Sequence, residues 1–190
     1  MVLATGNPGK VRELRLLLPA NVRLQGLADL GIDAELPETG ETLEANARQK
    51  AEHVFRSTGL PSIADDTGLE VAALGGEPGV FSARYAGPQK SAEANMSLLL
   101  DRLGPGMDRR ARFRTVIALA STEGTRTFEG VVEGRIATER RGTGGFGYDP
   151  IFIPQGTELS FAEMDPAEKN RIGHRGRAMR ALLAHLRAQR

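Results

Sequence analysis

Cysteine is absent from this 190-residue chain. Its absence excludes disulfide bonds, a thiolate nucleophile and zinc sites built on cysteine. Long apolar runs are missing as well: no stretch reaches the roughly 18 apolar residues of a membrane-spanning helix, so we expect no membrane partner. The first residues also lack the charged, apolar and small-residue order of an export signal, and we expect a cytoplasmic protein.

An excess of one charge is missing too. The chain has 25 basic and 24 acidic residues, which leaves a net charge of +1. Binding to the phosphates of nucleic acids needs a basic excess, so we expect no nucleic acid among the partners. Only residues 169–190 are locally basic, and a helix there could contact phosphates or simply present a solvated face.

Lysine is scarce and occurs at four positions only, 10, 50, 90 and 169, so arginine supplies most of the basic surface. A compact ammonium group fits a phosphate oxygen in a narrow pocket better than a guanidinium fork does. Lys10, Lys50 and Lys169 are therefore candidate phosphate ligands, although four residues could also be placed by chance.

Short helical and strand patterns alternate along the chain and predict an α/β fold. A turn at Glu123-Gly124 joins two strand patterns into a hairpin, which indicates a mixed sheet rather than a purely parallel one. We expect one domain over residues 1–190, with two lobes that share one core. The expected strands are 1–4, a strand ending at 63–64, 113–120, 127–136 and 151–153; the expected helices begin near 11 and 91, cover 43–55 and carry 178–186.

The first candidate site is the loop between the first strand and the first helix. This arrangement directs backbone N–H groups and the helix dipole toward an anion, and Lys10 adds a positive charge. The loop is not a Walker A motif, and an ordinary strand-to-helix turn explains it equally well. Its residues are Thr5, Gly6, Asn7, Pro8, Gly9 and Lys10.

Carboxylates provide the second candidate site. Glu38, Glu41 and Glu44 lie before and in the second expected helix, and Asp65 and Asp66 follow a buried strand that we expect to end there. Mg²⁺ prefers one or two protein carboxylates together with water and phosphate oxygens. The glutamates could instead be a solvated helix start, which is the reading we favour for Glu44.

The third candidate site is the glycine-rich stretch 142–150. Glycines around Phe146 predict a loop that lays the ring on a nucleobase, although the ring could equally pack into the core. His174 and Arg175 could bind a purine edge or a phosphate, whereas a lone histidine is more often structural.

These segments, in this order, resemble the inosine triphosphate pyrophosphatase (ITPase) family. The resemblance covers nearly the whole chain. The matching pieces are 5–10, Glu38-Thr39-Gly40 with Asn46 and Lys50, 64–69, 74–85, 146–150, and Lys169 with His174-Arg175.

The resemblance implies an elongated mixed sheet flanked by helices, two lobes with a nucleotide cleft between them, and a homodimer. It implies hydrolysis of inosine and xanthosine triphosphates, or their deoxy forms, to the monophosphate and pyrophosphate, which removes deaminated purines from the nucleotide pool. It further implies a Mg²⁺ ion held by Glu38 and Asp66, with Asp66 also taking the proton of the attacking water. The implied substrate ligands are residues 5–10, Lys50, Thr67 and Lys169 for the triphosphate, and Phe146, Gly147, Tyr148, Asp149, His174 and Arg175 for the base.

Two other functions stay open from the sequence. A Maf-type pyrophosphatase for pyrimidine or modified nucleotides would use the same phosphate chemistry with a different base pocket. A nucleotide-binding regulator without turnover would have less need of a water-activating carboxylate such as Asp66.

Overall fold

A single mixed sheet organises the protein. The computed structural model describes residues 1–19, 24–32 and 36–189. Its seven strands lie in the order β2-β1-β3-β5-β6-β7, and β4 pairs with β3. β1 is parallel to β2 and β3, whereas β4 and β7 run antiparallel to their neighbours, which confirms the expected mixed α/β sheet. The strands are β1 (Val2–Leu3), β2 (Gln25–Gly26), β3 (Ser62–Val71), β4 (Pro78–Gly79), β5 (Arg110–Ser121), β6 (Gly124–Ile136) and β7 (Phe152–Pro154).

Side-chain caps fix where most of the helices begin. Thr42, Ser91 and Asp165 each accept a hydrogen bond from a backbone N–H of the first turn. The α-helices are α1 (Pro8–Leu17), α2 (Leu43–Thr58), α3 (Ala92–Arg102), α4 (Pro166–Ile172) and α5 (His174–Ala188). Short 3₁₀ turns cover Ala28–Leu30, Ala72–Leu74, Ser82–Arg84 and Asp149–Ile151. None of the helices within the described ranges is both long and apolar enough to cross a membrane.

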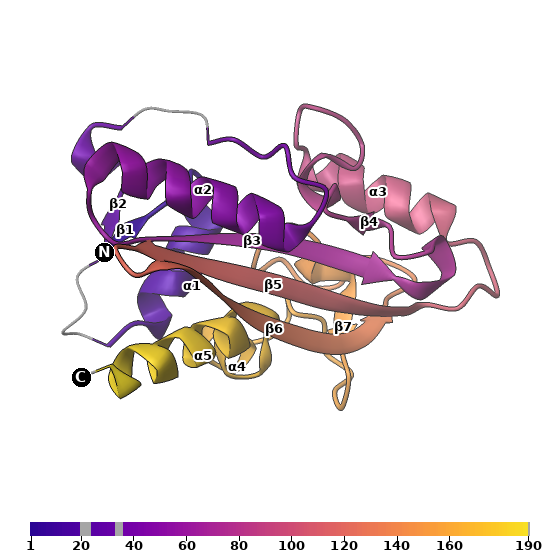
Figure 1. Ribbon diagram of the computed structural model, residues 1–190. Helices are drawn as coiled ribbons and strands as arrows, with labels where there is room; N and C mark the ends of the chain where they lie inside the picture. The colour runs from indigo at the N-terminus through magenta and orange to yellow at the C-terminus, as the bar shows by residue number, and fades with distance from the viewer. Residues whose placement is uncertain (20–23, 33–35, 190) are drawn as a thin grey trace. The chain divides into compact units, whose positions relative to one another are not determined.

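The chain forms two compact units, and β3, β5 and β6 contribute residues to both. The first unit contains 1–66, 115–130 and 175–190. In it, α2 covers one face of the strands, and α1 and α5 lie on the other face (Figure 1). Its core joins Leu3, Ile63 and Ile117 of the strands to Leu14 of α1 and Leu182 of α5. This packing buries the apolar faces that the sequence pattern predicted for α1 and α5.

The second unit contains 67–114 and 131–174. An aromatic cluster fills its core, where Phe113 lies edge-on to Phe152 with ring centroids 4.7 Å apart. Leu99 of α3 and Phe161 pack into the same cluster. The single two-lobed domain expected from the sequence stays a prediction.

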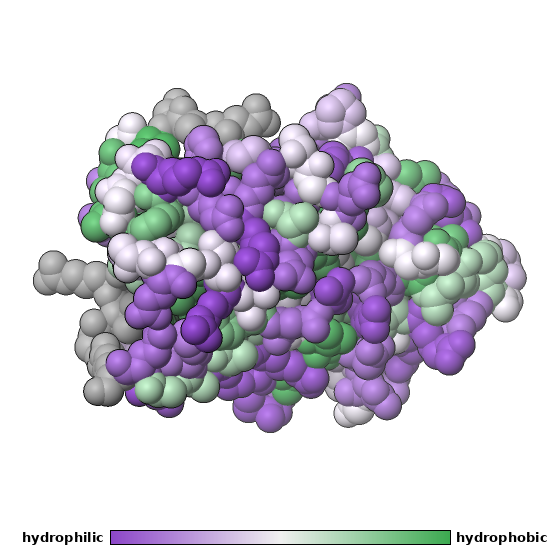
Figure 2. All heavy atoms as spheres, viewed as in Figure 1, coloured by the Kyte–Doolittle hydropathy of each residue, from purple (hydrophilic) through white to green (hydrophobic). Residues whose placement is uncertain are grey.

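The described residues leave few large apolar side chains exposed. The face in Figure 2 is mostly hydrophilic, and its hydrophobic areas are small and separate. The most exposed large apolar side chains among the described residues are Leu16 at 68% and Phe81 at 55%. Phe81 is also covered in part by the guanidinium of Arg84, 5.2 Å from the ring centroid.

Three sequence expectations need correction. β3 does not end at Ile63-Ala64 but continues through Asp65 and Asp66 to Val71, because its later residues pair with β4. α1 begins at Pro8 rather than near Val11, since Asn7 caps the helix and proline is favoured in its first turn. α4 was missed because its seven residues are too few to show a helical period.

Candidate active site

The first loop of the chain carries an Asn-capped helix start. The side chain of Asn7 accepts hydrogen bonds from the backbone N–H groups of Gly9 (2.9 Å) and Lys10 (3.2 Å). The backbone N–H of Asn7 donates to the Thr5 hydroxyl. The Asn7 side chain thus accepts two of the backbone N–H groups at this helix start. The helix dipole and the Lys10 ammonium remain as the attraction for an anion at this end of α1.

Asp65 is a buried anion that gathers cations in the first unit. Its side chain is fully buried, and its Oδ2 lies 3.1 Å from Lys10 Nζ and 3.2 Å from Arg175 Nε. Arg175 also forms an ion pair with Glu13 of α1. The result is a chain of alternating charges, Glu13, Arg175, Asp65 and Lys10, that fixes the Lys10 ammonium beside the first loop.

Lys50 brings the two proposed metal-binding carboxylates together. From α2, its Nζ lies 2.7 Å from Glu38 Oε1 and 3.0 Å from Asp66 Oδ1. The same ammonium donates to the backbone carbonyl of Asp65 at 2.9 Å. Carboxylates from the loop before α2 and from the middle of β3 therefore converge on one positive charge.

Polar side chains on one face of α2 hold the Glu38 segment in place. Asn46 accepts from the backbone N–H of Gly40 at 2.8 Å and donates to Asp66 Oδ2 at 3.3 Å. Gln49 exchanges two hydrogen bonds with Thr39. A side chain at Gly40 would collide with Asn46, so glycine is needed for this close approach.

Burial and charge shift the pKa values of the carboxylates in opposite directions. For Asp66, burial is the largest effect and raises the pKa, although Lys50 and Lys10 oppose it. For Asp65, burial also acts to raise the pKa, but Lys10, Arg175 and Lys50 outweigh it and hold the value well below the usual range. Asp65 is thus an anion at neutral pH, whereas Asp66 is a better proton acceptor than an ordinary aspartate.

The two lysines also differ. Burial lowers the pKa of Lys10 despite the opposing charge of Asp65. Burial acts in the same sense on Lys50, but Asp66, Asp65 and Glu38 outweigh it and raise the pKa. Lys50 is therefore charged at neutral pH, as phosphate binding requires.

In the second unit, Asp149 organises the glycine-rich loop. Its Oδ2 accepts the backbone N–H of Phe146 at 2.7 Å and lies 2.5 Å from Lys169 Nζ. The Lys169 ammonium also lies 4.9 Å from the centroid of the Phe146 ring. Gly145 has φ +70°, and a side chain there would collide with the Asp149 carboxylate. Phe146 is half-buried, and the next residue, Gly147, also has a positive φ.

Tyr148 and His174, two of the expected base ligands, are both buried. Tyr148 is 5% exposed, and its hydroxyl donates to the Ser82 carbonyl at 2.9 Å. The His174 ring is buried and stacks on Phe113, with centroids 4.6 Å apart. Thr67 follows Asp66 on β3 and is half-buried.

The structure thus brings the expected residues together in two groups. Glu38, Lys50 and Asp66 meet in the first unit, and Lys10 and Arg175 join them through Asp65. Lys169, expected with the triphosphate ligands, instead lies with Asp149 and Phe146. Arg175, expected at the base, is paired with Asp65 and Glu13. The substrate contacts themselves stay predictions.

Several residues that hold these groups in place were missed from the sequence. Glu13 and Gln49 gave no signal beyond their helical spacing from Lys10 and from Asn46. Ser82 lies in a 3₁₀ turn within the matching stretch 74–85, which assigned it no role, and Asn95 lies on α3. Only their buried hydrogen bonds, seen in three dimensions, identify them.

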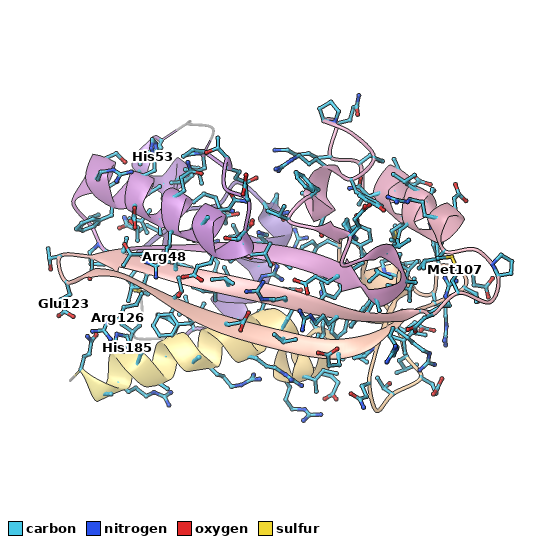
Figure 3. The ribbon with its side chains drawn as sticks, turned by 45° about the vertical axis from the view of Figure 1, so that its right-hand side comes forward. Arg48, His53, Met107, Glu123, Arg126 and His185 are labelled. Atoms are coloured by element: carbon cyan, nitrogen blue, oxygen red, sulfur yellow. The ribbon has the colours of Figure 1, made fainter. Side chains whose placement is uncertain are left out.

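His53 lies on α2 and His185 on α5, and Glu44 lies at the start of α2, as expected for a solvated helix start. Arg48 extends from α2 toward the β5–β6 hairpin, where it donates to the Thr125 carbonyl (Figure 3). It also forms an ion pair with Glu44, one turn earlier on α2. His185 of α5 lies beside Phe128 of β6, with ring centroids 5.3 Å apart. Glu44 is therefore part of a surface ion pair and not of the carboxylate group.

The donor set at Glu38 and Asp66 fits a hard divalent cation. Both residues offer carboxylate oxygens, and both already lie against a positive charge, the Lys50 ammonium. Mg²⁺ commonly takes only one or two protein carboxylates and fills its shell with water and phosphate oxygens. Among the described residues, no three Asp, Glu or His side chains gather into a larger metal-binding cluster.

Comparisons with known proteins give the family. The model of the Ham1 family matches residues 1–185. The chain belongs to the Ham1 family. It is 50% identical over 186 residues to a dITP/XTP pyrophosphatase of Christiangramia forsetii, with 98% of each chain covered. It is 52% identical to a dITP/XTP pyrophosphatase of Porphyromonas gingivalis, covering 96% of this chain and 94% of that one.

The fold is confirmed in the same way. The solved structure of the Staphylococcus aureus Ham1 protein matches this chain with a TM-score of 0.90 at 42% identity, covering 100% of this chain and 98% of that one. The resemblance found in the sequence motifs is therefore confirmed over nearly the full length.

Proposed function

We propose that this protein hydrolyses the triphosphates of inosine and xanthosine, or their deoxy forms, to the monophosphate and pyrophosphate. The observation that carries the proposal is the convergence of Glu38 and Asp66 on Lys50, with Lys10 held nearby through Asp65. The names of the relatives, dITP/XTP pyrophosphatase, support the substrate class.

The phosphate chemistry follows from the charges of the first unit. Lys10 and Lys50 bind phosphate oxygens and offset the negative charge that develops on the leaving pyrophosphate. Asp66, whose pKa burial raises, accepts the proton of the water that attacks the α-phosphorus. Asp65 keeps its charge and holds Lys10 in place.

A divalent cation completes the proposal. Glu38 and Asp66 would hold Mg²⁺, which supplies a Lewis acid that neutralises phosphate charge when bound. Lys50 would then lie beside Glu38 and Asp66, the two ligands of the ion. Its ammonium would orient their carboxylates and contact the substrate phosphates.

The base would be bound by residues of the second unit. Phe146 stacks on the purine ring. Lys169 and Asp149 hold the loop that carries Phe146. Selectivity comes from hydrogen-bond donors to the 6-oxo group, because the 6-amino group of adenine would set a donor against a donor. We propose that the protein acts in the cytoplasm as a homodimer, as the sequence resemblance implies.

Pyrophosphate release from a substrate panel tests the function. ITP, dITP and XTP are expected to be hydrolysed with kcat/KM at least about a hundredfold above that of ATP, because the purine 6-position is read by donors. Activity should disappear in excess EDTA and return with added Mg²⁺. Equal turnover of ATP and ITP would contradict the base selectivity, and hydrolysis of pyrimidine nucleotides alone would favour a Maf-type enzyme. Tight ITP binding without any release would indicate a regulator.

Glu38→Gln tests the metal site separately. The substitution keeps the size of the side chain but removes one anionic ligand, so the Mg²⁺ concentration for half-maximal activity should rise about tenfold or more. Glu41→Gln is the matched control, since Glu41 is an exposed member of the same acidic segment. An unchanged Mg²⁺ requirement in Glu38→Gln would remove Glu38 from the metal site.

A further inference from the structure

Tyr148 follows the proposed base-stacking residue, Phe146, by two positions and packs into the core cluster of the second unit. Its side chain is almost fully buried, and its hydroxyl donates to the Ser82 carbonyl at 2.9 Å. Burial raises its pKa, so the hydroxyl stays protonated and able to donate throughout the neutral range. The hydroxyl of this tyrosine is therefore already bonded within the protein.

The acceptor of this hydrogen bond is itself held firmly. Asn95 of α3 donates to the carbonyls of Ser82 (3.3 Å) and Ala83 (3.0 Å) and accepts from the N–H of Ala86 (2.7 Å). The Ser82 hydroxyl also accepts the N–H of Leu69 on β3. Ser82 thus provides a fixed point tied to both α3 and the sheet.

Two hydrogen bonds tie Phe146 to Asp149 within the loop. Asp149 accepts the N–H of Phe146, and its own N–H donates back to the Phe146 carbonyl. Gly145 and Gly147 both have positive φ, so the backbone around Phe146 is the kind that glycine permits and other residues resist. A loop with two such glycines needs side-chain tethers to stay in one position.

We propose that Tyr148 is a positioning residue: through its bond to the Ser82 carbonyl, its hydroxyl fixes Phe146 for stacking on the purine base. Asn95 belongs to the same device, because it holds the acceptor. The inference rests on the proposed function and deepens it, since it assigns Tyr148 a role behind the base site in place of the direct contact that the sequence suggested.

This role predicts a defined kinetic signature. The base is remote from the α-phosphorus, so a loosened Phe146 weakens the binding of the ground state and of the transition state equally. This raises KM and leaves kcat unchanged. Because stacking accepts any base, ITP and XTP should lose affinity by the same factor. The expected rise in KM is about two- to tenfold, as for the loss of one neutral hydrogen bond.

Tyr148→Phe tests the inference by removing one oxygen atom. The fold should survive, because the ring remains and the Ser82 carbonyl keeps its bond from Asn95. Tyr85→Phe is the matched control. It is the other of the two tyrosines of the chain, it lies in the same unit, and its hydroxyl bonds to Glu77 and Arg102 at the surface. Steady-state kinetics with ITP and XTP at saturating Mg²⁺, with thermal unfolding in parallel, gives the readout.

The outcomes separate the two proposals. Support is an equal rise in KM for ITP and XTP in Tyr148→Phe, unchanged kcat, and normal constants in Tyr85→Phe. An unchanged KM, a loss confined to one base, or loss of the fold would each overturn the positioning role. If the parent protein releases no pyrophosphate from either nucleotide, the proposed function fails first and the inference falls with it.

Discussion

Asp66→Asn is expected to lower kcat for ITP by about 10²- to 10⁴-fold, the usual contribution of a general base. The amide has nearly the same shape but cannot take a proton from water. The fold should persist, because Lys50 keeps Glu38 and the Asp65 carbonyl as partners. Burial already disfavours the charge on Asp66, so its removal costs little there, and we expect a loss of stability below about 2 kcal/mol.

Single-turnover release of pyrophosphate, with urea unfolding of the same preparation, measures both parts of this prediction. Asp101→Asn is a suitable control, since Asp101 is exposed on α3 in the second unit. A folded Asp66→Asn protein with near-parental turnover would remove Asp66 from the catalytic role, whatever its part in metal binding.

The largest effect on stability is expected for Asp65→Ala. The substitution leaves the positive charges of Lys10 and Arg175 without their shared buried carboxylate. Removing one partner from a buried ion pair commonly costs about 3–5 kcal/mol, because the other charge stays desolvated. Activity should fall as well, since Lys10 loses the contact that holds it beside the first loop.

The pH dependence of unfolding gives this prediction a sign. The pKa of Asp65 is held well below its usual range, so its charge adds stability at pH values above the unfolded-state pKa of about 3.9. That contribution is lost as the pH falls toward the lower native-state value. The difference in unfolding free energy between parent and Asp65→Ala should therefore be constant near neutral pH and shrink below about pH 4.

Asp108→Ala is the control for Asp65→Ala. Asp108 also forms an ion pair, with Arg110, but both groups are exposed at the surface. Its loss should cost much less stability than the loss of Asp65, because solvent screens an exposed ion pair. Equal effects of the two substitutions in urea unfolding would show that burial of Asp65 contributes nothing.

Local patterns were sufficient for much of the fold. The β5–β6 hairpin, α2 and α3 were predicted because periodicity and caps such as Ser91 act within a few residues. The boundaries of β3 were not, because strand pairing with β4 extended it beyond Asp66. A strand's length depends on its partners, and those lie elsewhere in the sequence.

The candidate site divides in the same way. The sequence by itself determined which types of residue form the candidate site, such as Glu38, Lys50 and Asp66, because the order of motifs and the composition are properties of the linear chain. Only the tertiary structure decided which of them meet: it placed Arg175 on Asp65, Lys169 on Asp149 and the Tyr148 hydroxyl on Ser82. The physical reason is that buried charges and donors must find partners, and folding supplies these from distant segments that local sequence does not record.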